Sequence, residues 1–362
     1  MRFVVDPRVR YNYATWYLYG IAKIYGVASI HFDVAPFVAI RYDDFMEYIS
    51  GMPLLVIMDD GRERRIFIDY GDYDMIFPDR YQWADVYGKV NVTEEQLRKF
   101  DKVIAIGPDF GIRIEKPLAA LWRGLRNYWK SRKHTAIPMW RMMGDYAYSF
   151  VRRLELDCYQ PQADMSVQEG YVFHASTLWC KPYMDKTTNA ARGAFLRICK
   201  ELGLKVEGGL YYIGGMQDDT MPDYPKYLKK YKEWILRKRV SARKYVEGTQ
   251  SSVCVFNTPT VGMCHGWKLA EYLCMGKAII STPLTRVMPG EGLVHGRNIH
   301  IVNNPQELRE AVCKLREDRN YRRKLEQRAR AYYEQYLAPE VVVGRIIKKS
   351  LSPTLPKRGR EF

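Results

Sequence analysis

The stretch that decides the fold spans residues 262–283 and reads Gly262-Met-Cys-His-Gly-Trp-Lys-Leu-Ala-Glu-Tyr-Leu-Cys-Met-Gly-Lys-Ala-Ile-Ile-Ser-Thr-Pro283. One apolar β-type run, residues 253–256, precedes it, and a second, residues 278–280, lies near its end. The pattern therefore predicts a helix over 266–276 that connects two parallel strands. Ligands of such sheets bind at the carboxyl ends of the strands, so we expect a binding site where this helix begins.

Two charges stand out in this short helix. Lys268 falls in its first turn, where free backbone N–H groups and the positive end of the helix dipole favour an anion and oppose a cation. A phosphate bound just after Gly266 would satisfy both the N–H groups and the lysine. Glu271 lies four residues after Trp267 and shares its face of the helix, away from the apolar stripe. We therefore expect Glu271 to point toward the site.

Glu271 and the Tyr-Leu-Cys-Met-Gly-Lys-Ala-Ile-Ile that follows it resemble the donor-binding segment of group 1 glycosyltransferases with the GT-B fold. In that family the Glu holds the ribose of a nucleotide sugar, and nearby Lys or Arg side chains hold its diphosphate. Many members carry a second Glu eight residues earlier, a position that Met263 occupies here. We expect His265 and Lys268 to take over its contact with the donor sugar. The resemblance is clear over residues 250–340.

The resemblance implies two Rossmann-like α/β domains that face a cleft, with a C-terminal helix that crosses back to the first domain. The length of 362 residues agrees with two domains of about 150 residues each. Hydrophobic periodicity fades over residues 154–169, which is typical of a linker. We expect an N-terminal acceptor-binding domain over 1–155, a nucleotide-sugar-binding domain over 156–338, and a C-terminal helix and basic tail over 339–362.

Both halves of the chain alternate β-type and helical patterns, which predicts α/β domains. In the second half, residues 171–174 and 206–213 predict strands, and residues 190–202 and 225–246 predict helices. Ser176 and Thr177 follow the first of these strands, and Arg192 lies on the helix after it. In related enzymes this region contacts the diphosphate, so Thr177 and Arg192 join the expected donor site. The ordinary alternatives are a solvated Arg192, a His265 packed in its loop and a structural ion pair for Glu271.

Acidic residues in the first half suggest a second site. Asp72-Tyr-Asp74 matches the Asp-x-Asp triplet that holds a metal–diphosphate complex in the other large glycosyltransferase fold, but it lies far from the donor motif in the sequence. We expect acceptor-side roles there, with Asp69 and Asp72 as candidate catalytic bases. The histidines and seven cysteines show no metal-ligand spacing, so we expect no metal site, no disulfide and no cofactor beyond a UDP- or GDP-linked sugar as co-substrate.

A net charge of +16 indicates a polyanion or an anionic membrane as a partner. On a helical wheel for residues 118–133, a stripe of Arg123, Arg126, Lys130 and Lys133 lies beside a stripe of Trp122, Leu125 and Trp129. This pattern fits a helix on an anionic membrane surface, and equally a solvated face beside a core stripe. Residues 226–244 carry nine Lys or Arg and one acid, which on a single helix fits a nucleic-acid stripe or a solvated face.

These observations favour a metal-independent glycosyltransferase that moves a sugar from a nucleotide sugar to a glycan or lipid-linked glycan, in surface polysaccharide or glycan synthesis. The start of the chain resembles a β-strand rather than a signal peptide, so we expect a cytoplasmic protein with peripheral contact at the cytoplasmic membrane face. Two alternatives remain open: a DNA-modifying glucosyltransferase of the same fold, and a non-catalytic nucleic-acid-binding protein.

Overall fold

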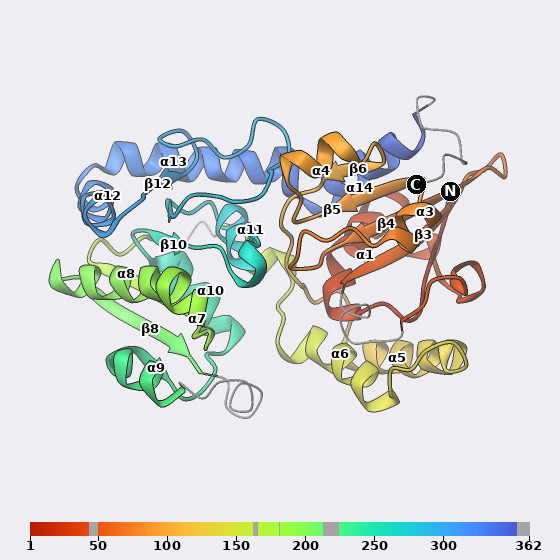
Figure 1. The fold of residues 1–362 in the computed structure, drawn as a ribbon, viewed down its shortest axis with the longest axis horizontal. Coiled ribbons are helices and arrows are strands. Elements are labelled where there is room, and N and C mark those ends of the chain that lie inside the picture. Colours follow the sequence, from red (N-terminus) through yellow and green to blue (C-terminus); the bar gives the residue numbers. More distant parts are fainter. Residues whose placement is uncertain (43–49, 162–165, 181, 213–223, 353–362) are drawn as a thin grey trace. The chain divides into compact units, whose positions relative to one another are not determined.

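The computed structural model describes residues 1–42, 50–161, 166–180, 182–212 and 224–352 (Figure 1). The chain forms two compact units. Unit 1 comprises Met1–Leu156, Arg286–Gly292 and Glu334–Phe362, and unit 2 comprises Asp157–Thr285 and Leu293–Tyr333. Unit 1 therefore takes up two segments that lie beyond residue 155 in the sequence. In the described part of the chain, no helix combines the length and the apolar character needed to cross a membrane.

Unit 1 is built on a six-stranded sheet with the strand order β2-β1-β3-β4-β5-β6. Its strands are β1 (Arg2–Val5), β2 (Ile30–Phe32), β3 (Gly51–Ile57), β4 (Glu63–Asp69), β5 (Val86–Lys89) and β6 (Val103–Ala105). β3 pairs antiparallel with β1 and β4, whereas the pairs β1–β2, β4–β5 and β5–β6 are parallel. A tight turn that contains Asp59, Asp60 and Gly61, the last at a positive φ of 80°, joins β3 to β4.

Helices cover this sheet, and the last of them, α14, packs on the first, α1 (Figure 1). They are α1 (Tyr11–Tyr25), α3 (Pro78–Trp83), α4 (Glu94–Lys99), α5 (Pro117–Ser131), α6 (Met139–Val151) and α14 (Pro339–Ser350). α14 packs on α1 so closely that a Cβ added at Gly20 would lie 2.4 Å from the Pro339 carbonyl oxygen. Lys23 and Glu340 form an ion pair of 2.6 Å across the same contact. The expected return of the C-terminal helix to the first domain is therefore confirmed.

Unit 2 contains two three-stranded sheets whose strand pairs are all parallel. One consists of β7 (Tyr171–Thr177), β8 (Lys205–Tyr211) and β9 (Ile235–Leu236), and the other of β10 (Val255–Asn257), β11 (Ile279–Ser281) and β12 (His300–Ile301). The sheets meet where the Val253 N–H donates to the Tyr171 carbonyl, 2.9 Å away. The helices are α7 (Pro182–Met184), α8 (Ala190–Glu201), α9 (Tyr224–Lys230), α10 (Ala242–Ser251), α11 (Trp267–Cys274), α12 (Pro305–Glu317) and α13 (Arg319–Tyr332).

The α/β fold class expected from the sequence is confirmed in both units. In unit 2, a buried cluster that includes Phe195 of α8 and Phe256 of β10 forms the core, with the two rings stacked at a centroid distance of 4.8 Å. One expectation is wrong, because residues 225–246 do not form a single helix. Ile235 and Leu236 pair with Leu210 and Tyr211 of β8, so a short strand separates α9 from α10.

Candidate functional site

The order of the strands in unit 2 marks where a ligand would bind. From β7 the chain proceeds to β8 and β9 on one side, and from β10 it proceeds to β11 and β12 on the other. β7 and β10 lie next to each other, so the strand order reverses between them. In parallel α/β sheets, such a reversal leaves a crevice at the carboxyl ends of the two strands, because the helices that follow them leave on opposite faces. These ends are Ala175–Thr177 and Asn257.

Arg192 of α8 reaches both strand ends. Its Nε donates to the Thr258 hydroxyl at 3.0 Å, and its Nη1 donates to the Thr177 carbonyl at 2.8 Å. The side chain is buried, so the solvated-helix alternative for Arg192 is wrong. The structure thus brings Arg192 and Thr177 together, as the sequence analysis expected, and adds Thr258, which it had not identified.

α11 begins at this same edge of the sheet. Gly266 occupies the N-cap position and Trp267 the first helical position, while Leu269, Ala270 and Leu273 are buried in the core. Gly266 has no side chain to cap the N–H groups of the first turn, which are the groups that would face an anion at a helix N-terminus. Lys268 Nζ donates to the Ala175 carbonyl and lies 5.0 Å from the centre of the Tyr245 ring. The lysine therefore turns back from the helix toward the end of β7.

Glu271 lies one turn further along α11, with 7% of its surface exposed. Its Oε2 accepts a hydrogen bond of 2.6 Å from the Tyr245 hydroxyl. Tyr245 belongs to α10, and its ring packs edge-on against Phe173 of β7 at 6.1 Å. Burial, followed by the negative charge of Glu271, raises the pKa of Tyr245 well above its usual value, so the hydroxyl remains a donor. A fixed donor therefore orients the Glu271 carboxylate.

Positive charge accumulates at this edge. Burial and then repulsion by Arg192 lower the pKa of Lys268 to about 7, although Glu271 acts in the opposite direction. Burial lowers the pKa of Arg192 to about 10, so the guanidinium is charged at pH 7. Burial, Lys268 and Arg192 together hold the pKa of His174 well below its usual value, and this histidine is neutral. Two cationic groups thus repel each other at a helix N-terminus, an arrangement that an anion stabilises.

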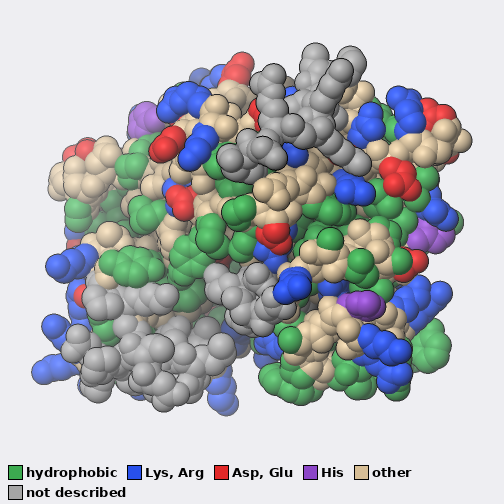
Figure 2. Space-filling model, turned by 45° about the vertical axis from the view of Figure 1, so that its right-hand side comes forward, with side chains coloured by type: hydrophobic (Ala, Val, Ile, Leu, Met, Phe, Trp, Pro, Cys, Tyr) green, Lys and Arg blue, Asp and Glu red, His purple; other side chains and the backbone are tan. Residues whose placement is uncertain are grey.

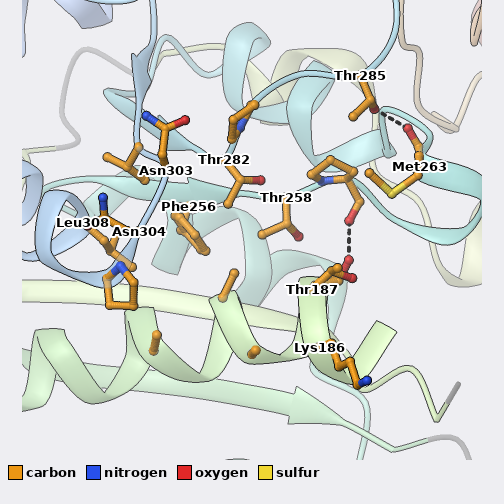
Figure 3. A pocket seen from close by; sticks show the side chains of 18 residues that line it. Lys186, Thr187, Phe256, Thr258, Met263, Thr282, Thr285, Asn303, Asn304 and Leu308 are labelled. Atoms are coloured by element: carbon orange, nitrogen blue, oxygen red, sulfur yellow. Dashed lines mark hydrogen bonds between the residues drawn. The ribbon is translucent and has the colours of Figure 1, made fainter. Parts of the chain in front are cut away.

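A cavity of about 440 Å³ adjoins this cluster within unit 2. Figure 3 shows Thr258, Thr282 and Phe256 on its walls, together with Met263 and Thr285, whose hydroxyl donates to the Met263 carbonyl. Thr258 connects the two regions, because it lines the cavity and accepts the hydrogen bond from Arg192. The cavity has the volume of a small-molecule site.

The loop before α11 holds Met263 and His265, and Trp267 begins the helix. Met263, at the position where the resembling family has a Glu, has a positive φ of 59° and lines the cavity. His265 is buried with 4% of its surface exposed, so it is part of the packed loop, and Trp267 is half-buried. We base the donor site on Lys268, Arg192 and Glu271, and the expected contact of His265 with a donor sugar stays a prediction.

In unit 1, the two candidate bases occupy different environments. Asp69, at the end of β4, is fully buried and accepts hydrogen bonds from Tyr87 Oη at 2.6 Å, Lys89 Nζ at 2.8 Å and the Gly71 N–H at 2.9 Å. These contacts give Asp69 a structural role in place of the base role expected from the sequence. Asp72 is exposed in the following loop.

The other acid of the triplet, Asp74, is held by an ion pair. Asp74 pairs with Arg286 at 3.2 Å, and the described residues contain no group of three or more His, Cys, Asp or Glu that could hold a metal ion.

Sequence reasoning missed Asp109, which follows the end of β6. Its carboxylate is buried with 3% of its surface exposed, and among the described residues no group donates a hydrogen bond to Oδ2. Burial raises the pKa of Asp109 to about 7. The neighbouring Tyr17 hydroxyl acts to lower this pKa, and the negative charge of Asp72 acts to raise it. A buried carboxylate with a raised pKa is suited to general-base catalysis near neutral pH. The Gly-Pro-Asp-Phe-Gly sequence signals a turn, and nothing in it indicates this burial.

The two basic segments also differ from their expected form. Arg123 of α5 is half-buried and paired with Glu115, so it is not part of an exposed basic stripe. Trp122 and Trp129 are exposed rather than packed in a core. Residues 226–244 include β9 and parts of two helices, so the single basic helix that fitted a nucleic-acid stripe does not exist.

No protein-family model matches the sequence, and no curated protein sequence matches it. Solved structures do match. A glycosyltransferase from Rickettsia africae matches at a TM-score of 0.40 and 8% identity, over 73% of this chain and 62% of that chain. Anabaena HepE in complex with UDP matches at a TM-score of 0.39 and 12% identity, over 73% of this chain and 90% of that chain.

A UDP-forming trehalose-phosphate synthase from Burkholderia vietnamiensis matches at a TM-score of 0.44 and 10% identity, over 77% of this chain and 62% of that chain. The chain thus spans less than two thirds of the Rickettsia and Burkholderia proteins. All three structures match at TM-scores below 0.5 and identities of 12% or less. Many of the matching structures are group 1 GT-B glycosyltransferases, the family that residues 250–340 resemble.

Proposed function

We propose that this protein transfers a sugar from a UDP- or GDP-linked donor to a glycan or lipid-linked glycan. The observation that carries the proposal is the convergence of Arg192, Lys268 and the start of α11 at the strand reversal, one turn from Glu271. Two cations and a helix N-terminus suit a diphosphate. A carboxylate fixed by Tyr245 suits the two adjacent hydroxyls of a ribose.

The residues have separate roles in this scheme. During transfer, the bond between the anomeric carbon and the diphosphate oxygen breaks, and the diphosphate keeps the electron pair. Lys268 and Arg192 stabilise the charge that grows there, so we propose that the reaction needs no divalent metal. The acceptor oxygen forms the new bond and loses its proton. We assign that proton to a carboxylate of unit 1, with Asp109 as the base and Asp72 on the acceptor side.

The setting that we propose is surface polysaccharide or glycan synthesis. Of the observations that favour nucleic acid, the net charge of +16 stands, whereas residues 226–244 do not form the single basic helix that would fit a nucleic-acid stripe. A DNA-modifying glucosyltransferase would still share the donor site, so only an acceptor assay separates it from the proposal.

Donor hydrolysis tests the proposal directly. The protein is incubated with a panel of UDP- and GDP-sugars without acceptor, and release of the nucleoside diphosphate is measured. We expect slow release from one donor class, and loss of release in Glu271→Ala and Arg192→Met. A matched control is Glu247→Ala, which removes an exposed carboxylate from α10. If no nucleotide sugar binds or reacts and the protein instead binds duplex DNA, the result would favour the alternative of a non-catalytic nucleic-acid-binding protein over the proposal.

A further inference from the structure

Helices α5 and α6 of unit 1 expose large apolar side chains. Leu118, Trp122 and Trp129 on α5 are 83%, 70% and 58% exposed, and Trp140 on α6 is 73% exposed. The three residues of α5 follow a helical spacing of four and seven, which places them on one face. Three of the eight tryptophans in the chain are therefore on the surface of one helix pair. Clustered exposed apolar residues mark an interaction site, whereas scattered ones do not.

α5 packs on α6 through the face of the helix that does not carry Trp122 and Trp129. α5 turns its small and polar residues inward, where Ala120, Gly124, Asn127 and Ser131 are buried. A Cβ at Gly124 would lie 2.9 Å from the Tyr146 ring, and Asn127 Nδ2 donates to the Tyr146 hydroxyl at 2.8 Å. The tryptophans are therefore not part of a core stripe, which excludes the ordinary alternative for this helix.

Basic side chains surround the tryptophans. Residues 116–144 contain no Asp or Glu, and the exposed basic residues among them include Arg126, Lys130, Arg132 and Lys133. The Arg132 guanidinium lies 4.2 Å from the centre of the Trp129 ring. Figure 2 shows hydrophobic and basic side chains together at the lower right, where α5 and α6 lie in Figure 1. We name these four basic residues, with Leu118, Trp122, Trp129 and Trp140, the α5–α6 surface.

We infer that the α5–α6 surface docks on the anionic surface of a membrane. Tryptophan rings favour the membrane–water interface, and Lys and Arg beside them bind anionic headgroups. A nucleic acid would also attract the cations, but it would leave the aliphatic Leu118 at the end of the stripe without a partner. The inference is independent of the proposed function, because it concerns unit 1 alone and its test needs no nucleotide sugar.

Vesicle binding tests the contribution of the tryptophans. The full-length protein is mixed with vesicles of phosphatidylcholine alone or with one third phosphatidylglycerol, and the bound fraction is measured by co-sedimentation. We expect binding only to the anionic vesicles. W122S/W129S should weaken it about tenfold or more, the factor that corresponds to ~1.5 kcal/mol for one exposed apolar side chain. The control I24S/V27S changes two apolar residues of unit 1 that are 43% and 69% exposed, and it should bind as the wild type does.

Charge reversal tests the contribution of the cations. R126E/K133E should reduce the affinity for anionic vesicles by at least 25-fold, because each cation near the surface contributes about fivefold, or ~1 kcal/mol. The control R237E/K238E changes the net charge by the same amount, but at exposed residues of unit 2. It should have little effect on the affinity for anionic vesicles. Equal loss in both variants would show that only the overall charge attracts the vesicles, and the inference would be wrong. It would also be wrong if the tryptophan variant, folded by circular dichroism, loses affinity for duplex DNA but keeps its affinity for vesicles.

Discussion

The Tyr245 hydroxyl lies 2.6 Å from Oε2 of Glu271 and connects α10 to α11. The tyrosine ring also lies 5.0 Å from Lys268 Nζ, so one side chain contacts both the carboxylate and the cation of the site. Tyr245 therefore positions these two groups without itself being assigned a contact with the substrate.

Tyr245→Phe should weaken nucleotide binding without abolishing it. The loss of one hydrogen bond to a buried carboxylate costs about 1.5 kcal/mol, or roughly tenfold in the dissociation constant. Titration calorimetry with UDP and GDP measures the change. Tyr171→Phe is the matched control, because its hydroxyl contacts Glu207 in the same sheet at the opposite end of β7. Equal affinities in Tyr245→Phe and the wild type would show that Glu271 does not depend on this donor.

Nucleotide binding should take up a proton at pH 8. The pKa of Lys268 is lowered to about 7 by burial and by Arg192, so much of the lysine is neutral at that pH. A bound diphosphate raises this pKa, because it favours the charged form. The affinity should then fall by up to about tenfold per pH unit above 7, and calorimetry in buffers of different ionisation enthalpy should show the uptake. Lys268→Arg stays charged, so proton uptake should disappear. Uptake that persists in this variant would assign the proton to another group.

Much of the donor site could be predicted from the sequence, because Gly266, Lys268 and Glu271 lie within one short helix whose spacing fixes their faces. The contact of Arg192 with Thr258 could not be predicted, since it joins residues 66 positions apart through the direction of one long side chain. Tyr245 was missed because the basic residues of 225–246 suggested a continuous helix, whereas the pairing of Ile235 with β8 breaks it. The sequence predicted Asp69 as a base because it does not show that the residue is buried and bound to Lys89. Both are features of the tertiary structure.

Asp109→Asn should stabilise the protein at pH 8. Burial raises the pKa of Asp109 to about 7, so the folded state holds its proton more tightly than the unfolded state. Stability from this group is present at low pH and is lost as the pH rises through 7. The variant should therefore gain ~2 kcal/mol or more in the free energy of unfolding at pH 8 and nothing near pH 4. Urea unfolding measures both values.

The same variant should lose activity if Asp109 is the base. The wild-type rate should rise with an apparent pKa near 7, and that inflection should be absent in Asp109→Asn. Asp33→Asn, a change of an exposed acid in unit 1, is the control for both measurements. A stabilised variant with the full wild-type rate would leave Asp109 as a buried acid without a catalytic role.

Chelation should leave transfer intact. The proposed site neutralises the diphosphate with Lys268 and Arg192, so EDTA should not change the rate. Asp72→Asn should alter acceptor chemistry and leave the nucleotide affinity unchanged. The opposite result is a rate that EDTA abolishes and Mn²⁺ or Mg²⁺ restores, together with nucleotide binding that Asp72→Asn eliminates. That result would move the donor site to unit 1.

The central claim is that Glu271 of unit 2 binds the ribose of a nucleotide donor, and equilibrium binding tests it most directly. Titration of the wild type with UDP and with GDP should give saturable binding of at least one of them. Glu271→Ala should weaken that binding by about 1.5–3 kcal/mol, or roughly 10- to 150-fold, because the charged hydrogen bonds are lost. Glu247→Ala should bind as the wild type does. A folded Glu271→Ala protein with unchanged affinity for both nucleotides would contradict the account.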